Sequence, residues 1–190
     1  PDNLIYASNQ FLADLLVWYH LSWLAESTRR NDPRVAQLED KACNFTVHDR
    51  RDLLQIILEQ LRGIVPRYRE LSQRGQVELC MSPYAHPIVP LLLDLGSARE
   101  AMPEAHLPVA DKYPGGEERA RWHLRQGRET FQRVFGHEPK GLWPSEGGVS
   151  QEALALCADD GFQWVASGGN VLDNSHDAHN KSCSHRVYRF

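Results

Sequence analysis

A carboxylate and an aromatic ring stand three residues apart in the stretch 141–150, where Glu146 follows Trp143. A carboxylate can stabilise a cationic transition state and an indole face can stack on a pyranose ring, so the pair suits sugar chemistry. Two glycines after Glu146 permit backbone conformations that other residues avoid, and Ser150 is a good helix N-cap. The stretch is therefore predicted to be a strand end, a turn and a helix start, where α/β folds collect reacting side chains. The alternative makes Glu146 a solvated turn residue and Trp143 a core residue.

A second turn rich in polar and aromatic groups covers residues 82–87, directly after the predicted strand 76–81. Tyr84 and His86 lie in this turn, where they could hydrogen-bond a substrate. A His before Pro is also an ordinary turn residue, and that interpretation stays open. Glu78 lies on the strand itself, where it would orient a sugar hydroxyl, pair with an arginine or face water. A buried acid without a partner is costly, so a buried Glu78 needs such a reason.

Helical and strand patterns alternate along the chain. Helices are expected at residues 8–27, 46–73, 88–95, 117–135 and 151–160, and strands at 76–81, 162–167 and 187–190. This alternation favours an α/β fold with a mostly parallel sheet and right-handed crossovers.

The apolar stripe of helix 8–27 predicts a well-buried helix, and Asn31-Asp32-Pro33 predicts a loop over residues 28–45. Pro66 should kink or split the helix 46–73, because it removes one backbone hydrogen bond. Trp164, inside an apolar strand, is expected in the core.

Composition excludes several classes of partner. The 190 residues carry 25 acids and 21 bases, a formal net charge of -4, which gives no support for binding nucleic acid or an anionic membrane. No apolar run is long enough to span a bilayer, and the first residues lack a signal-peptide pattern. They also lack a starting Met, so we expect a processed chain or an excised piece. Four scattered cysteines indicate free thiols in a reducing compartment, and we expect a cytoplasmic protein.

A cluster of metal-ligand types occurs near the end of the chain, at His176, His179, Cys183 and His185. Its spacings loosely resemble a zinc site. The segment is polar and aperiodic, however, and the surrounding Asn, Asp and Ser residues are typical of a loop. We therefore predict no metal and no cofactor.

Two segments together resemble glycoside hydrolase family 57, the group of α-amylases, amylopullulanases and 4-α-glucanotransferases. Gly75-Gln76-Val77-Glu78-Leu79, running on to Ser82-Pro83-Tyr84-Ala85-His86-Pro87-Ile88-Val89-Pro90-Leu91, resembles that family's second motif and the Tyr-His-Pro segment beyond it. Gly141-Leu142-Trp143-Pro144-Ser145-Glu146 resembles the third motif, whose Glu is the family's nucleophile. The flanks 14–18 and 161–166 are also similar, so the resemblance covers most of the chain.

The resemblance implies an incomplete (β/α)7 barrel that cleaves or transfers α-glucosidic bonds of starch-like or glycogen-like glucans with retention. It implies that Glu146 is the nucleophile and that residues 1–190 are one domain, the central part of the barrel. The family's first motif is expected before Pro1 and its acid/base Asp beyond Phe190. Ala85 stands where many relatives carry an aromatic residue, which suggests an altered sugar subsite. Retaining hydrolysis needs two carboxyl groups roughly 5 Å apart, so we expect the isolated chain to be inactive or nearly so.

Two other function classes stay open. One is a carbohydrate-binding or regulatory domain that keeps the barrel groove without turnover. The other is a metal-dependent polysaccharide deacetylase or α-mannosidase, which ranks third because no Asp-Asp or His-x-x-x-His pattern stands at a predicted strand end. Open sheet edges of a partial barrel would also favour self-association.

Overall fold

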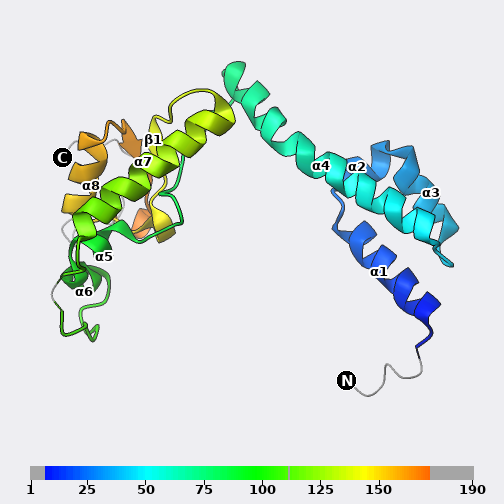
Figure 1. Cartoon of the computed structure of the whole chain (residues 1–190), viewed down its shortest axis with the longest axis horizontal. Coiled ribbons are helices and arrows are strands. Elements are labelled where there is room, and N and C mark those ends of the chain that lie inside the picture. The colour runs from blue at the N-terminus through cyan, green and yellow to red at the C-terminus, as the bar shows by residue number, and fades with distance from the viewer. Residues whose placement is uncertain (1–6, 111, 172–190) are drawn as a thin grey trace. The chain divides into compact units, whose positions relative to one another are not determined.

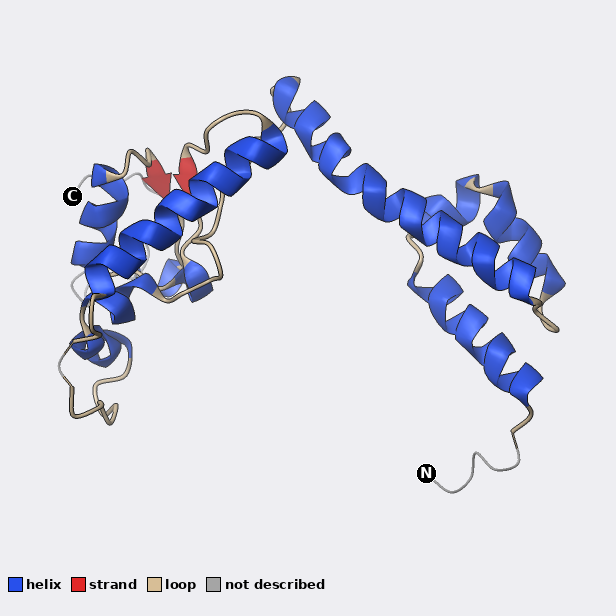
Figure 2. Ribbon diagram, in the orientation of Figure 1, coloured by secondary structure: helices blue, strands red, loops and turns tan. Residues whose placement is uncertain are grey.

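The computed structural model describes residues 7–110 and 112–171, and the chain is α/β with far more helix than strand (Figure 1, Figure 2). The described residues form two compact units that divide between Arg67 and Tyr68. Each unit has its own cluster of buried apolar side chains. The expectation that residues 1–190 act as one domain stays a prediction.

The first unit is helical. It contains α1 (Asn9–Trp23), α2 (Glu26–Asn31), α3 (Pro33–Lys41) and most of α4 (Val47–Gln73). The loop predicted for residues 28–45 is wrong, because α2 and α3 lie there. The Asp32 carboxylate accepts the N–H of Arg34, and Pro33 occupies the first turn of α3. A proline at that position starts a helix instead of breaking one, since its missing N–H would have no partner there anyway.

Helices α1 and α4 begin at side chains that accept backbone N–H groups. The Ser8 hydroxyl accepts the N–H of Phe11 and caps α1. Thr46 and Asp49 form a capping box at the start of α4, with each side chain accepting the backbone N–H of the other. Helix α4 continues through Pro66 and is not split.

The predicted burial of the first helix is wrong. Only Val17 and Leu21 of α1 are buried, in a cluster completed by Val35, Leu38, Phe45, Leu53 and Ile56. The rest of the apolar stripe faces solvent within the described structure, and Trp23 is 75% exposed. Apolar side chains cover more of α1 than one narrow contact with α3 and α4 can bury, so the sequence pattern alone overstates burial.

The second unit surrounds a small parallel sheet. Its helices include α5 (Val89–Leu93), α6 (Ala98–Ala101), α7 (Gly116–Phe135) and α8 (Gln151–Asp159), and its strands are β1 (Gly141–Leu142) and β2 (Trp164–Val165). Strands β1 and β2 pair in parallel, and Met81 forms a parallel bridge to Leu142. Strand β1 therefore lies between β2 and the segment around Met81. Parallel pairing is confirmed, and the (β/α)7-type barrel stays a prediction.

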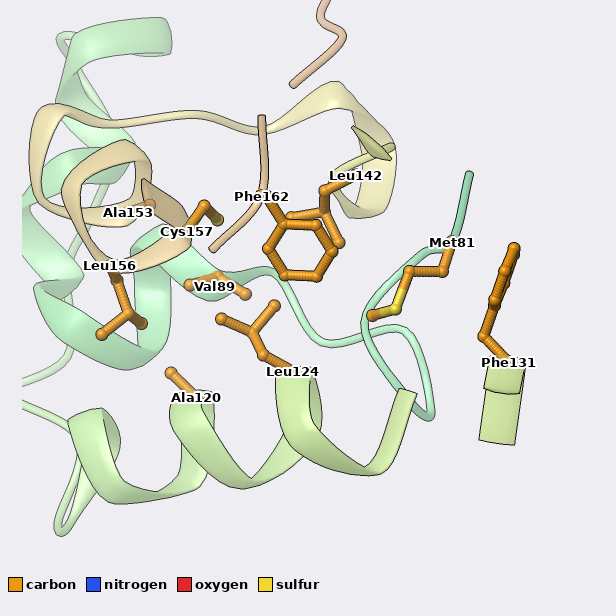
Figure 3. Close-up of a cluster of buried hydrophobic side chains, with 10 residues drawn as sticks. All are labelled: Met81, Val89, Ala120, Leu124, Phe131, Leu142, Ala153, Leu156, Cys157 and Phe162. Carbon is orange, nitrogen blue, oxygen red and sulfur yellow. The ribbon is translucent and has the colours of Figure 1, made fainter. Parts of the chain in front are cut away.

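Helices α7 and α8 cover the sheet with an apolar core (Figure 3). It consists of Met81, Val89, Ala120, Leu124, Phe131, Leu142, Ala153, Leu156, Cys157 and Phe162. Gly136 ends α7 in the left-handed region, and the Ser150 hydroxyl caps α8, which confirms the predicted N-cap. Burial raises the pKa of the Cys157 thiol to about 11.

Two further predictions concern Trp164 and the last strand. Trp164 is not in the core, because its side chain is 39% exposed. The strand predicted at 187–190 lies outside the described residues. Among the described helices, none combines the length and the apolarity that crossing a bilayer requires.

Candidate functional site

Three parallel chain segments end at the same edge of the small sheet. The Trp143 N–H donates to the Met81 carbonyl at 2.8 Å, and the Ala166 N–H donates to the Leu142 carbonyl at 3.1 Å. These bonds hold the segments together up to the points where their loops begin. The Ser167 hydroxyl then donates to the Gly147 carbonyl at 2.8 Å, which ties two of the loops to each other. Carboxyl ends of parallel strands are where α/β proteins place ligands.

Glu146 stands on a strained turn at this edge. It lies in the short 3-10 helix η3 (Ser145–Gly147) with φ 56° and ψ 17°, the left-handed region. Residues other than glycine are uncommon there, and such strain concentrates at functional sites. The side chain is 74% exposed, so its carboxylate is open to a ligand. The turn predicted from the glycines is therefore confirmed, and its strain falls on the acid itself.

His86 is brought to Glu146 from a loop 60 residues earlier in the chain. Its Nδ1 atom lies 3.8 Å from the Oε1 atom of Glu146, the distance of a loose ion pair when the imidazole is protonated. Ala85 and His86 both have positive φ, 57° and 58°. Two consecutive strained residues without a glycine aim this histidine at the acid. The structure thus joins two of the residues singled out from the sequence.

Tyr84 is held by α7. Its N–H donates to the His123 carbonyl at 3.1 Å, and its own carbonyl lies 2.6 Å from Nδ1 of His123. A carbonyl oxygen only accepts, so Nδ1 of His123 is the donor. The Trp122 ring meets the Tyr84 ring edge to face, with centroids 5.7 Å apart. Sequence reasoning missed Trp122 and His123, whose one signal was a polar-aromatic pair within the predicted helix 117–135.

Glu78 is engaged by an indole. Nε1 of Trp164 donates to Oε1 of Glu78 at 2.7 Å, and Glu78 is exposed. Within residues 7–110 and 112–171 its side chain therefore faces water with an indole as its partner, and no arginine pairs with it. The Trp164 ring covers the backbone of Gly141, where a Cβ atom would lie 2.0 Å from the ring carbon Cζ2. A glycine in β1 is therefore what lets the indole reach Glu78. Whether Glu78 also contacts a sugar stays a prediction.

Trp143 is half-exposed, which excludes the alternative that made it a core residue. Its backbone is fixed by the bond to Met81, so its ring stands on a rigid base beside the Glu146 turn. Ser145 is buried, and its hydroxyl has no hydrogen-bond partner within the described structure. A buried hydroxyl without a partner is costly and marks the turn as locally unsatisfied.

Acidic, histidine and cysteine side chains do not gather into a group of three or more that could hold a metal in residues 7–110 and 112–171. His176, His179, Cys183 and His185 lie outside the described residues.

The model of glycosyl hydrolase family 57 matches residues 18–190. Among solved structures, the chain is similar to a GH57-type branching enzyme from the hyperthermophilic archaeon Pyrococcus horikoshii, with 15% sequence identity and a TM-score of 0.41. That likeness covers 84% of this chain and 28% of the branching enzyme, so the chain spans little more than a quarter of that enzyme's length. Among curated proteins, none matches the sequence.

Proposed function

The chain belongs to glycosyl hydrolase family 57, and from this premise we propose that it is the central part of a catalytic barrel that acts on α-glucans. The proposed reaction is retaining hydrolysis or transglycosylation at the α-glucosidic bonds of starch-like or glycogen-like glucans. The observation that carries the proposal is Glu146, an exposed carboxylate on a left-handed turn with an imidazole 3.8 Å away. An open carboxylate at the carboxyl edge of parallel strands suits a nucleophile, and backbone strain of this kind concentrates at functional sites.

In the proposed mechanism, a carboxylate oxygen of Glu146 attacks the anomeric carbon while a carboxylic acid protonates the departing glycosidic oxygen. The resulting glycosyl ester is then released by water, which gives hydrolysis, or by a sugar hydroxyl, which gives transfer. The acid, left as a carboxylate by the first step, takes the proton of the incoming water or sugar hydroxyl in the second. Among the described residues, the ionisable partner recorded for Glu146 is His86, which we assign to orienting the carboxylate. We propose that the acid/base carboxyl is an Asp outside this chain.

Aromatic and polar side chains around the turn are proposed to bind the glucan. Trp143 offers a half-exposed ring on the same loop as the nucleophile, and Tyr84 offers another on the loop of His86. Flat aromatic faces stack on sugar rings through their C–H groups. Glu78, already bound to Trp164, would accept a sugar hydroxyl with its second oxygen.

Mass spectrometry with a mechanism-based reagent tests the proposal. The full-length polypeptide is incubated with a fluorinated α-glucosyl fluoride, alongside Glu146→Gln and, as a matched control on exposed helix surface, Glu152→Gln. We expect a covalent glucosyl adduct on Glu146 in the parent and in the control, and none in Glu146→Gln. An adduct on another residue would overturn the assignment.

A carbohydrate-binding domain is the second candidate, and the exposed rings of Tyr84 and Trp143 favour it. Maltooligosaccharide binding by a polypeptide that never forms an adduct would move the function to this class. We further propose that the isolated 190-residue chain has no measurable turnover on an α-glucan.

Location and self-association are proposed from surface features. Cys43 and Cys80 are free thiols at exposed positions, and Cys157 is a free buried one, which supports a reducing compartment such as the cytoplasm. The exposed apolar stripe of α1 supports self-association of the isolated chain with a second copy. Light scattering that finds only monomer at high concentration would contradict this.

A further inference from the structure

We propose that α7 forms one wall of a glucosyl-binding subsite through Trp122, opposite Tyr84, and that His123 fixes the loop that carries Tyr84. This inference rests on the proposed function, because it takes the ligand to be an α-glucan. Helix α7 carries none of the sequence motifs that predicted the site.

The two rings form a corner that opens to solvent. Tyr84 is 45% exposed and Trp122 is 41% exposed, and their planes meet at 87° with centroids 5.7 Å apart. A pair that served only to fill the core would be buried on both sides. An edge-to-face pair leaves apolar surface on two perpendicular planes, one able to stack on a pyranose face and the other able to contact its edge.

The corner formed by the Tyr84 and Trp122 rings lies next to Glu146, the proposed nucleophile, but does not include it. Tyr84 precedes His86 by two residues, a span of at most about 7 Å along an extended backbone. His86 in turn lies 3.8 Å from Glu146. A glucan whose cleaved bond sits at Glu146 would have the glucosyl unit beside the reacting one within reach of the corner, and the subsite is assigned to that unit.

His123 fixes the position of the Tyr84 loop, and with it the position of the corner relative to Glu146. It bonds the backbone of Tyr84 twice, once as donor through Nδ1 and once as acceptor through its carbonyl. The next two residues, Ala85 and His86, hold positive φ values, which persist only when surrounding contacts impose them. The clamp from α7 supplies such contacts. His123 is thus a positioning residue for His86 and for the ring of Tyr84.

Trp122 is tested by comparing a long substrate with a short reagent in the full-length polypeptide. Trp122→Ala should raise KM for maltoheptaose about tenfold, the loss of one stacking contact. The rate of labelling by the fluorinated glucosyl fluoride, which fills only the position at Glu146, should stay unchanged. Trp122→Phe should keep most of the affinity, and Arg125→Ala, exposed on the same helix, should change neither quantity.

His123 is tested by the labelling rate. His123→Leu, which removes the Nδ1 donor, should slow labelling at Glu146, while His123→Asn, which places an amide donor near the same point, should restore it. An unchanged KM in Trp122→Ala, or equal losses for maltoheptaose and the short reagent, would overturn the subsite. If the parent forms no adduct at all, the proposed function fails separately. Calorimetric binding of maltoheptaose to the parent and to Trp122→Ala then decides the subsite on its own.

Discussion

Replacing Gly141 by alanine will push a methyl group into the indole ring of Trp164. The added Cβ atom would lie 2.0 Å from Cζ2, 2.1 Å from Cε2 and 2.5 Å from Cη2 of that ring. Carbon atoms in ordinary contact are about 3.5–4.0 Å apart, so the ring must move by roughly 1.5–2 Å. Cε2 is bonded to the nitrogen that donates to Glu78, and the 2.7 Å bond to that carboxylate cannot survive such a shift.

The cost has two parts. Overpacking of a well-fitted site costs about 1–3 kcal/mol. The lost hydrogen bond adds about 1 kcal/mol, near the middle of the usual range, because Trp164 is 39% exposed and water can replace part of the contact. We therefore expect Gly141→Ala to lower the free energy of unfolding by about 2–4 kcal/mol.

Urea unfolding followed by circular dichroism measures this loss, and a double-mutant cycle assigns it. In a Trp164→Ala background the indole is absent, so Gly141→Ala should cost less than about 1 kcal/mol. Gly63→Ala provides a matched control, because nothing lies within 4 Å of its added Cβ atom and it sits inside helix α4. Alanine should stabilise that helix by up to about 1 kcal/mol.

Two results would refute the reasoning. Wild-type stability in Gly141→Ala would mean that the indole does not cover the strand. An equal cost in the presence and absence of the Trp164 indole would mean that the loss comes from the backbone of β1, and not from the ring.

Two other substitutions test separate features. Ser145→Ala removes a buried hydroxyl without a partner in the described structure, so the free energy of unfolding should rise by about 1 kcal/mol; a fall in urea titration would reveal a hydrogen bond to that hydroxyl. The Lys41 ammonium, aided by Thr46, lowers the pKa of Asp49 to about 2. A lowered folded-state pKa means that this stabilisation is present above about pH 4 and disappears as the pH falls towards 2. The stability difference between the wild type and Asp49→Asn should therefore shrink over that interval, and a constant difference would contradict the assignment.

Helix ends and turns were predictable because their partners are close in the chain. Ser8 and Ser150 each cap a helix by accepting an N–H three residues later. Gly136 ends α7 because glycine adopts positive φ without a steric penalty. The same local reasoning failed at Pro33, where a proline can either break or begin a helix and only the capping bond of Asp32 decides.

The candidate nucleophile was reached by pattern and by resemblance. Glu146 was recognised from a strand-turn-helix signature and from its likeness to a family motif, and the family assignment now rests on the match over residues 18–190. Its left-handed backbone is not readable from the sequence, because the pattern assigns the unusual conformation to the two glycines after it, of which Gly147 does adopt positive φ, 67°, and Gly148 does not.

The sequence by itself determined the helix caps at Ser8 and Ser150 and the turn around Glu146, since each depends on contacts within a few residues. Tertiary structure alone decided which side chains meet across long intervals. It placed His86 beside Glu146, bound Trp164 to Glu78 across 86 residues, and brought Trp122 and His123 to the loop of Tyr84. It also left the apolar stripe of α1 exposed. Burial and long-range pairing depend on how elements pack, and hydrophobic periodicity states only that a face is apolar, not what covers it.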